Sequence, residues 1–373
     1  MSRRIFRNDK PNNTDFVLDN FLEAEVKPAL MPLYVAQWLT LAPKYSLRYD
    51  LVTSNGYKFN ACIWLCITGI LAAWLNYVID YWTSSGGLLA TAVFAYSASV
   101  TISFIINSGV TTSKSNKHAH LIILLQRIIK RFNAKVDMKN VTIVNWVYVI
   151  SIVVFNIVHI ACRFADSKGI NILKIFTQFV YLSFDCNIVI CIRMMSVLGR
   201  CIAASLSELE CLGLDTELGE LRSKSINEDN DRAVAVINVY CQVFKHSIFL
   251  MVVVSFFQVL ANVQSTITVR VKTLSISTII AQLVWLKNIT LLTLLSLEAE
   301  NIHLQMKNSQ IFCLLLGINC PPDDQFLGSV CRRQCEKAQE WRGAPLPLDA
   351  GLPPRFLAEL ASYTVVILQF HFL

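Results

Sequence analysis

Six long, predominantly apolar stretches, separated by short polar segments, dominate the pattern of this chain. A helix that crosses a bilayer needs about 20 such residues, because the hydrocarbon is roughly 30 Å thick and a helix rises about 1.5 Å per residue. Charged residues or Gly/Ser turns bound each stretch, and none of the stretches contains proline. The pattern therefore predicts transmembrane helices over Asn60–Val78, Leu88–Thr111, Val141–Cys162, Ile175–Leu198, Ser247–Val269 and Leu274–Leu297.

Two further apolar segments are shorter. Pro28–Pro43 is free of charge for sixteen residues but contains Pro32, which favours a helix half-embedded in the interface over a span. Leu360–Leu373 is free of charge for only fourteen residues. A helix that starts at Pro353-Pro354, where proline is tolerated in the first turn, lengthens it to about twenty residues. We count this helix as the seventh span.

The positions of Lys and Arg orient these spans. With seven spans, most of the 33 Lys and Arg residues fall on the side of the N-terminus, whereas Lys168, Arg270 and Lys272 fall on the other side. The positive-inside rule therefore predicts a cytoplasmic N-terminus and an extracellular C-terminus. This topology is the inverse of that of a rhodopsin-like receptor, and the Asp-Arg-Tyr and Asn-Pro-x-x-Tyr motifs of such receptors are missing. Coupling to a G protein is disfavoured on both grounds.

The predicted organisation is an all-α membrane protein with short extracellular connections, so that a ligand must enter between helices. Its segments are a cytoplasmic N-terminus with the interfacial helix (1–57), spans one and two (58–112), a cytoplasmic amphipathic loop (113–140), spans three and four (141–199), a cytoplasmic loop and helix extension (200–243), spans five and six (244–298), a cytoplasmic loop (299–350), and span seven, which lines a pore (351–373).

Three cytoplasmic segments have helical patterns of their own. Ala119–Ala134 is amphipathic and either lies on the anionic leaflet or packs against neighbouring helices. The fourth span continues as helix past Arg200 through Ile202, Leu206 and Leu209, and the sixth continues over Leu297–Leu316. Together these segments are expected to form a cytoplasmic bundle. The acidic stretches at Asp215–Glu220 and Glu228–Asp231 are interpreted as a solvated loop.

Composition supports the membrane interpretation. Apolar residues make up 54% of the chain and charged residues only 16%, against roughly 25% charged in soluble domains. Mean hydropathy is +0.49. A disordered chain, a small disulfide-rich fold and a nucleic-acid reader are disfavoured, despite a net charge of +7. Most of the twelve cysteines lie inside apolar stretches, where they behave as small buried hydrophobic residues.

Enzymatic and metal-binding motifs are missing from the sequence. It has no phosphate-binding glycine loop, no Gly-x-Ser-x-Gly and no His-Glu-x-x-His. The cysteines at 313, 320, 331 and 335 have loose spacing, and Arg332 and Arg333 would repel a cation, so that ordinary loop residues are favoured over a zinc site. His118 and His120 are likewise interpreted as loop residues. We therefore predict neither an enzyme nor a bound cofactor.

Polar side chains inside the apolar stretches carry more information, because charge in a bilayer is expensive. Asp185 and Lys287 each lie half-way along a predicted span, and an ion pair between spans four and six is favoured over a site for a transported ion. Arg193 and Lys245 are the other such charges. A second group gathers towards the predicted outer half, as either a cavity for a small organic ligand or ordinary hydrogen bonds between helices: Tyr96, Asn156, His159, Gln178, Tyr181, Phe256, Gln258, Asn262, Gln282 and Trp285.

The last residues of the chain carry a motif. Ser362-Tyr363 is followed by five mostly apolar residues and then by Gln369-Phe370. This resembles the Thr-Tyr, five residues, Gln-Phe signature in the last helix of the insect gustatory receptor family, with Ser362 in place of threonine. The position of the motif at the end of a seventh span, in an N-in chain with short outer loops, strengthens the resemblance.

The resemblance implies a tetrameric, ligand-gated, non-selective cation channel in the plasma membrane of a chemosensory neuron. Its partners would be a small-molecule tastant, other receptor subunits and membrane lipids, with no nucleic acid. Gln369 and Phe370 would lie at the gate, where four Phe rings can exclude water and Gln amides can readmit it. Ser362 and Tyr363 would hold the last helix in its bundle, and the extensions of spans four to six would anchor the tetramer. Bitter or deterrent plant compounds are the family's most numerous ligands, with sugars as the alternative.

Two other classes of protein remain as alternatives to a channel. A secondary transporter is expected to have helices broken by Gly or Pro and internal repeats, whereas the six clear spans contain no proline and no obvious duplication. A receptor subunit without a pore of its own has no need of Gln369 and Phe370.

Overall fold

The computed structural model describes residues 20–40, 43–54, 57–85, 87–132, 137–166, 172–212, 219–268, 276–319 and 351–372. Almost all of this part is helical. Its elements are α2 (Lys27–Leu39), β1 (Ser46–Arg48), β2 (Leu51–Thr53), α3 (Tyr57–Ser85), α4 (Gly87–Ser113), α5 (Ser115–Phe132), α6 (Met138–Asp166), α7 (Ile172–Leu212), α8 (Gly219–Thr268), α9 (Ile276–Asn319) and α11 (Leu352–Phe372).

Four helices in the described part are long and apolar enough to cross a membrane. They correspond to predicted spans two to five and contain the stretches Ala90–Ser113, Met138–Cys162, Gln178–Ser205 and Ala235–Ser265. The first predicted span lies in α3, whose apolar part Trp64–Asp80 is shorter, and the sixth and seventh lie in α9 and α11. The chain is thus a mainly helical, membrane-associated protein.

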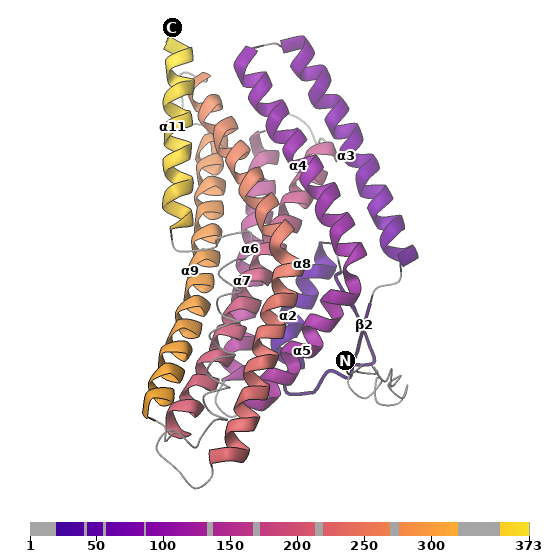
Figure 1. Ribbon diagram of the computed structural model, residues 1–373. Coiled ribbons are helices and arrows are strands. Elements are labelled where there is room, and N and C mark those ends of the chain that lie inside the picture. The colour runs from indigo at the N-terminus through magenta and orange to yellow at the C-terminus, as the bar shows by residue number, and fades with distance from the viewer. Residues whose placement is uncertain are drawn as a thin grey trace, which may run out of the picture.

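Helix α7 lies at the centre of the bundle, and α6 lies at its edge. Of the most apolar stretch in each helix, 83% of α7 is buried against 28% of α6. An apolar helix with so much exposed surface needs an apolar solvent, which the bilayer supplies. The helices α3, α6, α8 and α9 surround α7, and α11 packs on α8 and α9 (Figure 1). The approach of α9 to α7 is close at Gly199, where an added Cβ would lie 3.3 Å from Asn301 Nδ2.

Three helices are far longer than a bilayer is thick. Helices α7, α8 and α9 have 41, 50 and 44 residues, or about 60 to 75 Å at 1.5 Å per residue. The predicted continuation of spans four and six as helix is confirmed. The interpretation of Glu228–Asp231 as a loop was wrong, because these residues are helical within α8. No Gly or Pro occurs between Glu220 and Thr268 to end that helix.

Helix α5 packs into the protein by its apolar side. Leu121, Ile122, Leu125 and Ile129 are buried in the main core, and the helix contacts α7, α8 and β2. Packing against neighbouring helices, one of the two alternatives for this amphipathic segment, is therefore confirmed. His118 and His120 are in this helix and not in a loop, because the helix begins at Ser115.

The described part of the N-terminal segment packs on the bundle and shares its main core. Helix α2 has 13 residues with Pro32 inside it, and at about 20 Å it is too short to cross the hydrocarbon. It packs on α6 and α7. The short β1–β2 hairpin that follows was not predicted. Its turn residues Tyr49 and Asp50 have φ of 52° and 62°, the sign that tight hairpin turns require. The end of α11 lies at the opposite end of the bundle from α2, α5 and this hairpin (Figure 1).

Candidate functional site

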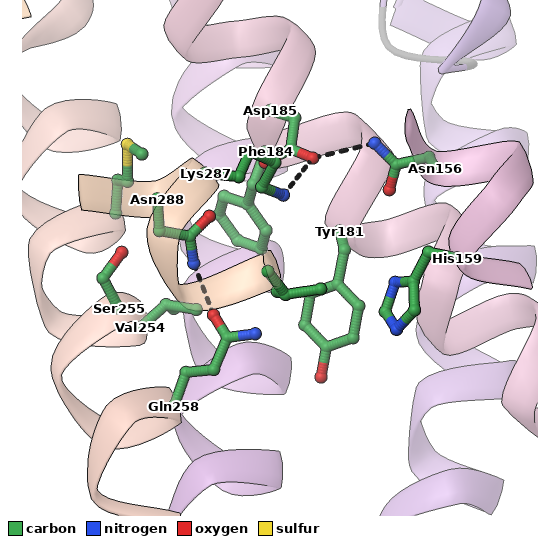
Figure 2. A pocket seen from close by; sticks show the side chains of 12 residues that line it. Asn156, His159, Tyr181, Phe184, Asp185, Val254, Ser255, Gln258, Lys287 and Asn288 are labelled. Atoms are coloured by element: carbon green, nitrogen blue, oxygen red, sulfur yellow. Dashed lines mark hydrogen bonds and ion pairs between the residues drawn. The ribbon is translucent and has the colours of Figure 1, made fainter. Parts of the chain in front are cut away.

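A pocket lies between α6, α7, α8 and α9, beside the part of the bundle that carries α11. Twelve residues line it, namely Asn156, His159, Tyr181, Phe184, Asp185, Met251, Val254, Ser255, Gln258, Val284, Lys287 and Asn288 (Figure 2). Within each helix these residues recur at intervals of three and four, which places them on one face. Each of the four helices therefore contributes a single face to the pocket.

Asp185 is the polar centre of this pocket. Lys287 Nζ lies 2.5 Å from Asp185 Oδ2, and Asn156 Nδ2 donates to the same oxygen at 2.9 Å (Figure 2). The two charged side chains are only 11% and 5% exposed. The predicted ion pair between these helices is therefore confirmed. An isolated ion here would pay a large desolvation cost, which the pairing and the amide hydrogen bond offset.

A second polar pair lies across the pocket. Asn288 Nδ2 donates to Gln258 Oε1 at 2.5 Å and so joins α9 to α8 (Figure 2). Within each of the two pairs, the polar side chains satisfy each other, so that much of the polar lining already has a protein partner. The remaining wall is apolar and aromatic. Tyr181 stacks at 5.9 Å on Tyr96 of α4, with the ring planes only 5° apart.

The pocket is small in this conformation. Water has access to about 20 Å³ of it, which is room for roughly one water molecule. Pockets that hold organic ligands have volumes of roughly 300 to 1,000 Å³. An organic ligand can therefore enter only if the helices around the pocket move apart.

The predicted pocket residues divide into three groups. Asn156, His159, Tyr181 and Gln258 line the pocket, and Tyr96 stands directly behind Tyr181. Phe256 and Trp285 lie instead in a separate apolar cluster beside α11. Gln282 is exposed, Gln178 has a buried Oε1 without a hydrogen-bond partner among the described residues, and Asn262 is half-buried; none of these three lines the pocket.

Sequence reasoning missed several lining residues because they are apolar or small. Phe184, Met251, Val254 and Val284 have no polarity to mark them in an apolar helix. The missed Ser255 and Asn288 are polar, and their spacing could have identified them as lining residues. Each is three or four residues from another lining residue on its own helix.

The cluster beside α11 joins the last helix to the pocket walls. Val259, Leu292, Phe356 and Leu360 are its buried members. Phe256 of α8 makes edge-on contacts with Tyr363 at 5.2 Å and with Phe356 at 6.5 Å between ring centroids. Trp285 of α9 packs against the same cluster. Helices α8 and α9 therefore present one face to the pocket and a neighbouring face to α11.

The C-terminal motif lies on α11 and is largely exposed in the single chain. Tyr363 is 50% exposed although it contacts Phe256. Ser362 Oγ donates to Ala358 O at 3.0 Å, within its own helix. Gln369 is exposed, and the side chain of Phe370 lies outside the part that the structure describes. The cysteines at 320, 331 and 335 also lie outside it.

Arg193, a second charge within a predicted span, is held by side chains of the neighbouring helix α6. Arg193 Nε donates to Asn145 Oδ1 at 2.6 Å, and its guanidinium lies 5.2 Å from the ring centroid of Tyr148. Asn145 Nδ2 in turn donates to Ala29 O at 2.7 Å. This chain of contacts ties α7 through α6 to α2, about two turns of α7 from Asp185.

No protein-family model and no curated protein matches the sequence of this chain. The resemblance of the C-terminal segment to the gustatory receptors therefore rests on its residues and on the topology predicted from the sequence.

Proposed function

We propose that this protein is a gustatory chemoreceptor subunit that acts as a tastant-gated, non-selective cation channel in the plasma membrane of chemosensory neurons. The observation that carries the proposal is the position of α8 and α9. Both helices line the pocket and both support α11, the helix that would line the pore. A ligand that separates the pocket walls would thereby move the supports of α11.

The geometry of α8 makes this coupling direct. Ser255 and Gln258 line the pocket, whereas Phe256, between them in sequence, contacts Tyr363. Successive residues of a helix point about 100° apart, so that one turn reaches both sites. Rotation or displacement of that turn changes the pocket and the α11 contact together. A ligand gates the channel if it binds the open arrangement more tightly than the closed one.

The exposed face of α11 fits a helix that meets other subunits. Leu357, Tyr363, Val365 and Val366 are all between 39% and 53% exposed. In a tetramer, four such helices would surround one pore, with Gln369 and Phe370 near its outer end. Rings of Phe would close the pore by excluding water. The seven-span topology with a cytoplasmic N-terminus and an extracellular C-terminus belongs to this proposal.

The lining favours bitter or deterrent plant compounds over sugars as ligands. The Asp185–Lys287 and Gln258–Asn288 pairs already satisfy much of the polar surface, and Phe184, Met251 and Val254 supply apolar wall. A mostly apolar ligand with few polar groups gains from this wall without breaking the pairs. A polyol needs free polar partners, and a sugar-gated channel is the alternative within the family.

A secondary transporter is the second candidate function. The observation that favours it is the charged pair in the pocket, because ion-coupled transporters place ionisable residues at their binding sites. In a non-conducting receptor subunit, a third alternative, the motif at Gln369-Phe370 would be without a function.

Whole-cell recording from cells that express the chain alone tests the proposal. We expect a panel of bitter compounds to evoke a cation current that reverses near 0 mV, and we expect Phe370→Ala to alter the leak or the gating. Saturable uptake that depends on an ion gradient, without current, would instead support the transporter. Surface expression without response to the panel, even with co-expressed receptor subunits, would contradict a tastant-gated channel.

A further inference from the structure

Lys44 is buried at the end of the bundle opposite to the end of α11, where the N-terminal segment rests on the helices. The side chain is among the largest fully buried ones of the described part and is only 2% exposed. Its Nζ lies 4.3 Å from the ring centroid of Phe244 on α8. Among the described residues, Nζ has no hydrogen-bond partner. A buried ammonium without a counter-charge is unusual, because desolvation of the charge is costly.

His118 of α5 is buried against the same ring. Its imidazole meets Phe244 edge-on, with 5.7 Å between the centroids, and only 4% of the residue is exposed. Tyr240 also packs on Phe244, at 4.8 Å, and its hydroxyl donates to Cys191 O at 3.2 Å. We call the residues Lys44, Cys191, His118, Tyr240 and Phe244 the Lys44 cluster.

Every element around the Lys44 cluster supplies neutral or positive groups. The segment of Lys44 itself contributes Tyr45, and Gln37 of α2 accepts the Lys44 backbone N–H at 3.0 Å. Ser115 Oγ of α5 donates to Lys44 O at 3.0 Å. The charges of Lys114 and Lys245 lie near, and Cys191 and Tyr240 are the titratable groups on α7 and α8. None of these groups, as far as the chain is described, is a carboxylate.

Both basic groups therefore resist protonation where they are. Burial lowers the pKa of Lys44 from 10.5 to about 8. Burial, with the charges of Lys44 and Lys114, holds the pKa of His118 well below 6.5. A group whose pKa is lowered in the docked state binds more protons when released, so that acid favours release. The two groups act in the same direction.

We propose that the buried Lys44 and His118 make the docking of the N-terminal segment, over its described residues 20–40 and 43–54, on the helical bundle releasable by acid, and we call this contact the latch. The latch contacts α8 at Phe244. Phe244 is twelve residues from Phe256 on the same continuous helix, or about 18 Å along its axis. Release would remove the contact of the N-terminal segment with α8 near Phe244. The same helix supports α11 at Phe256. In the proposed topology this makes cytoplasmic pH a regulator, which goes beyond gating by a ligand.

The size of the effect follows from proton linkage. Between pH 7.5 and 5.5, only the released imidazole, with an ordinary pKa near 6.5, takes up a proton, and this weakens docking by about tenfold. Between pH 7 and 9, the docked Lys44, with its pKa of about 8, loses its proton, and docking strengthens by about tenfold. The segment has other contacts with the bundle. Gln126 Nε2 donates to Phe21 O at 2.8 Å without a titratable group, and Lys130 Nζ of α5 forms an ion pair with Glu23 Oε1 at 2.7 Å, at an exposed position.

Hydrogen exchange of the α2 amides in the purified full-length protein tests the latch, after correction for the intrinsic pH dependence of exchange. In the native chain we expect the protection of α2 to fall about tenfold from pH 7.5 to 5.5 and to rise about tenfold from pH 7 to 9, while α7 changes little. His118→Gln should remove the fall in protection between pH 7.5 and 5.5, which we call the acid limb. Lys44→Met should remove the rise between pH 7 and 9, the alkaline limb, and should raise protection at neutral pH. The exposed His120 of the same helix is the matched control, and His120→Gln should keep both limbs.

Equal protection of α2 across this pH range in the native chain overturns the proposal. So does an acid limb that persists in His118→Gln, or an alkaline limb that persists in Lys44→Met. Because Lys44→Met replaces a buried charge with an apolar side chain of similar length, it tests the latch even if His118→Gln fails to fold. The readout needs neither ligand nor current, so its failure is distinguishable from a failure of the proposed channel function.

Discussion

At the scale of single residues, helical phase decides which polar side chains share a site. Phe256 and Gln258 are about 200° apart on α8, and the structure accordingly gives one to α11 and the other to the pocket. Sequence reasoning placed both in one cavity because it weighed residue type and depth without phase. Asp185 and Lys287 were found because unpaired charge in an apolar helix is too costly to leave unexplained.

The ion pair of Asp185 and Lys287 gives a prediction at this scale. Lys287→Met leaves a buried carboxylate with only the Asn156 amide beside it, which we expect to cost roughly 3 to 5 kcal/mol of stability. The double variant Asp185→Leu with Lys287→Met should recover most of this loss, because no unpaired charge remains. Thermal unfolding of the two variants in detergent measures the difference. Equal losses in the single and double variants would show that the pair contributes little beyond its packing.

The turn of the β1–β2 hairpin gives another residue-scale prediction. Tyr49 has φ of 52° and is 94% exposed. A left-handed backbone is unfavourable for a residue with a side chain, and no burial of the Tyr49 side chain offsets this strain. Tyr49→Gly should therefore stabilise the hairpin by about 0.5 to 1 kcal/mol. Slower hydrogen exchange at Leu51, which pairs with Arg48 directly across the turn, would measure this gain, with Tyr49→Ala as the control that keeps the backbone strain. Faster exchange in the glycine variant would contradict it.

At the scale of elements, the link between α8 and α11 is the feature on which the proposed gating depends. Phe256→Ala removes the ring that touches both Tyr363 and Phe356. We expect the ligand-evoked current to fall at least tenfold, while ligand-induced thermal stabilisation persists, because the pocket residues remain in place. Phe249→Ala is the matched control, since Phe249 lies on the same helix and is 53% exposed. Equal effects of the two substitutions on current would mean that the contact does not transmit the signal.

The elements themselves were largely predictable, and the failures have physical causes. Apolar length and the lack of Pro identified α4, α6, α7 and α8, and the amphipathic pattern identified α5. Glu228–Asp231 looked like a loop because its residues are charged, although charged residues form helices well. The β1–β2 hairpin was missed because it has only three residues in each strand, too few for a periodic pattern. The burial of Lys44 was missed because a lysine outside the spans is expected to reach water.

At the scale of the whole molecule, the first and the last of the described segments lie at opposite ends of the bundle. The end of α11 is remote from α2, α5 and the hairpin (Figure 1). The basic residues of α5, including Lys117, Arg127 and Arg131, are exposed at the end where the N-terminal segment docks. By the positive-inside rule we expect that end to face the cytoplasm. With the odd number of crossings that we propose, the C-terminus would lie outside, as a pore-lining seventh span requires.

Epitope tags at the two termini test this topology. In intact cells, an antibody should reach a tag after Leu373 and should reach a tag before Met1 only after permeabilisation. The glycosylation-type triplets at Asn12, Asn140 and Asn288 should remain unmodified, because the first two would face the cytoplasm and the third lies within the membrane on this topology. A glycosylation triplet introduced in the second predicted outer loop, near Lys168, is the positive control. If both tags were cytoplasmic, the number of crossings would be even, α11 could not cross from inside to outside, and the proposed pore would have to be abandoned even if the pocket still bound its ligand.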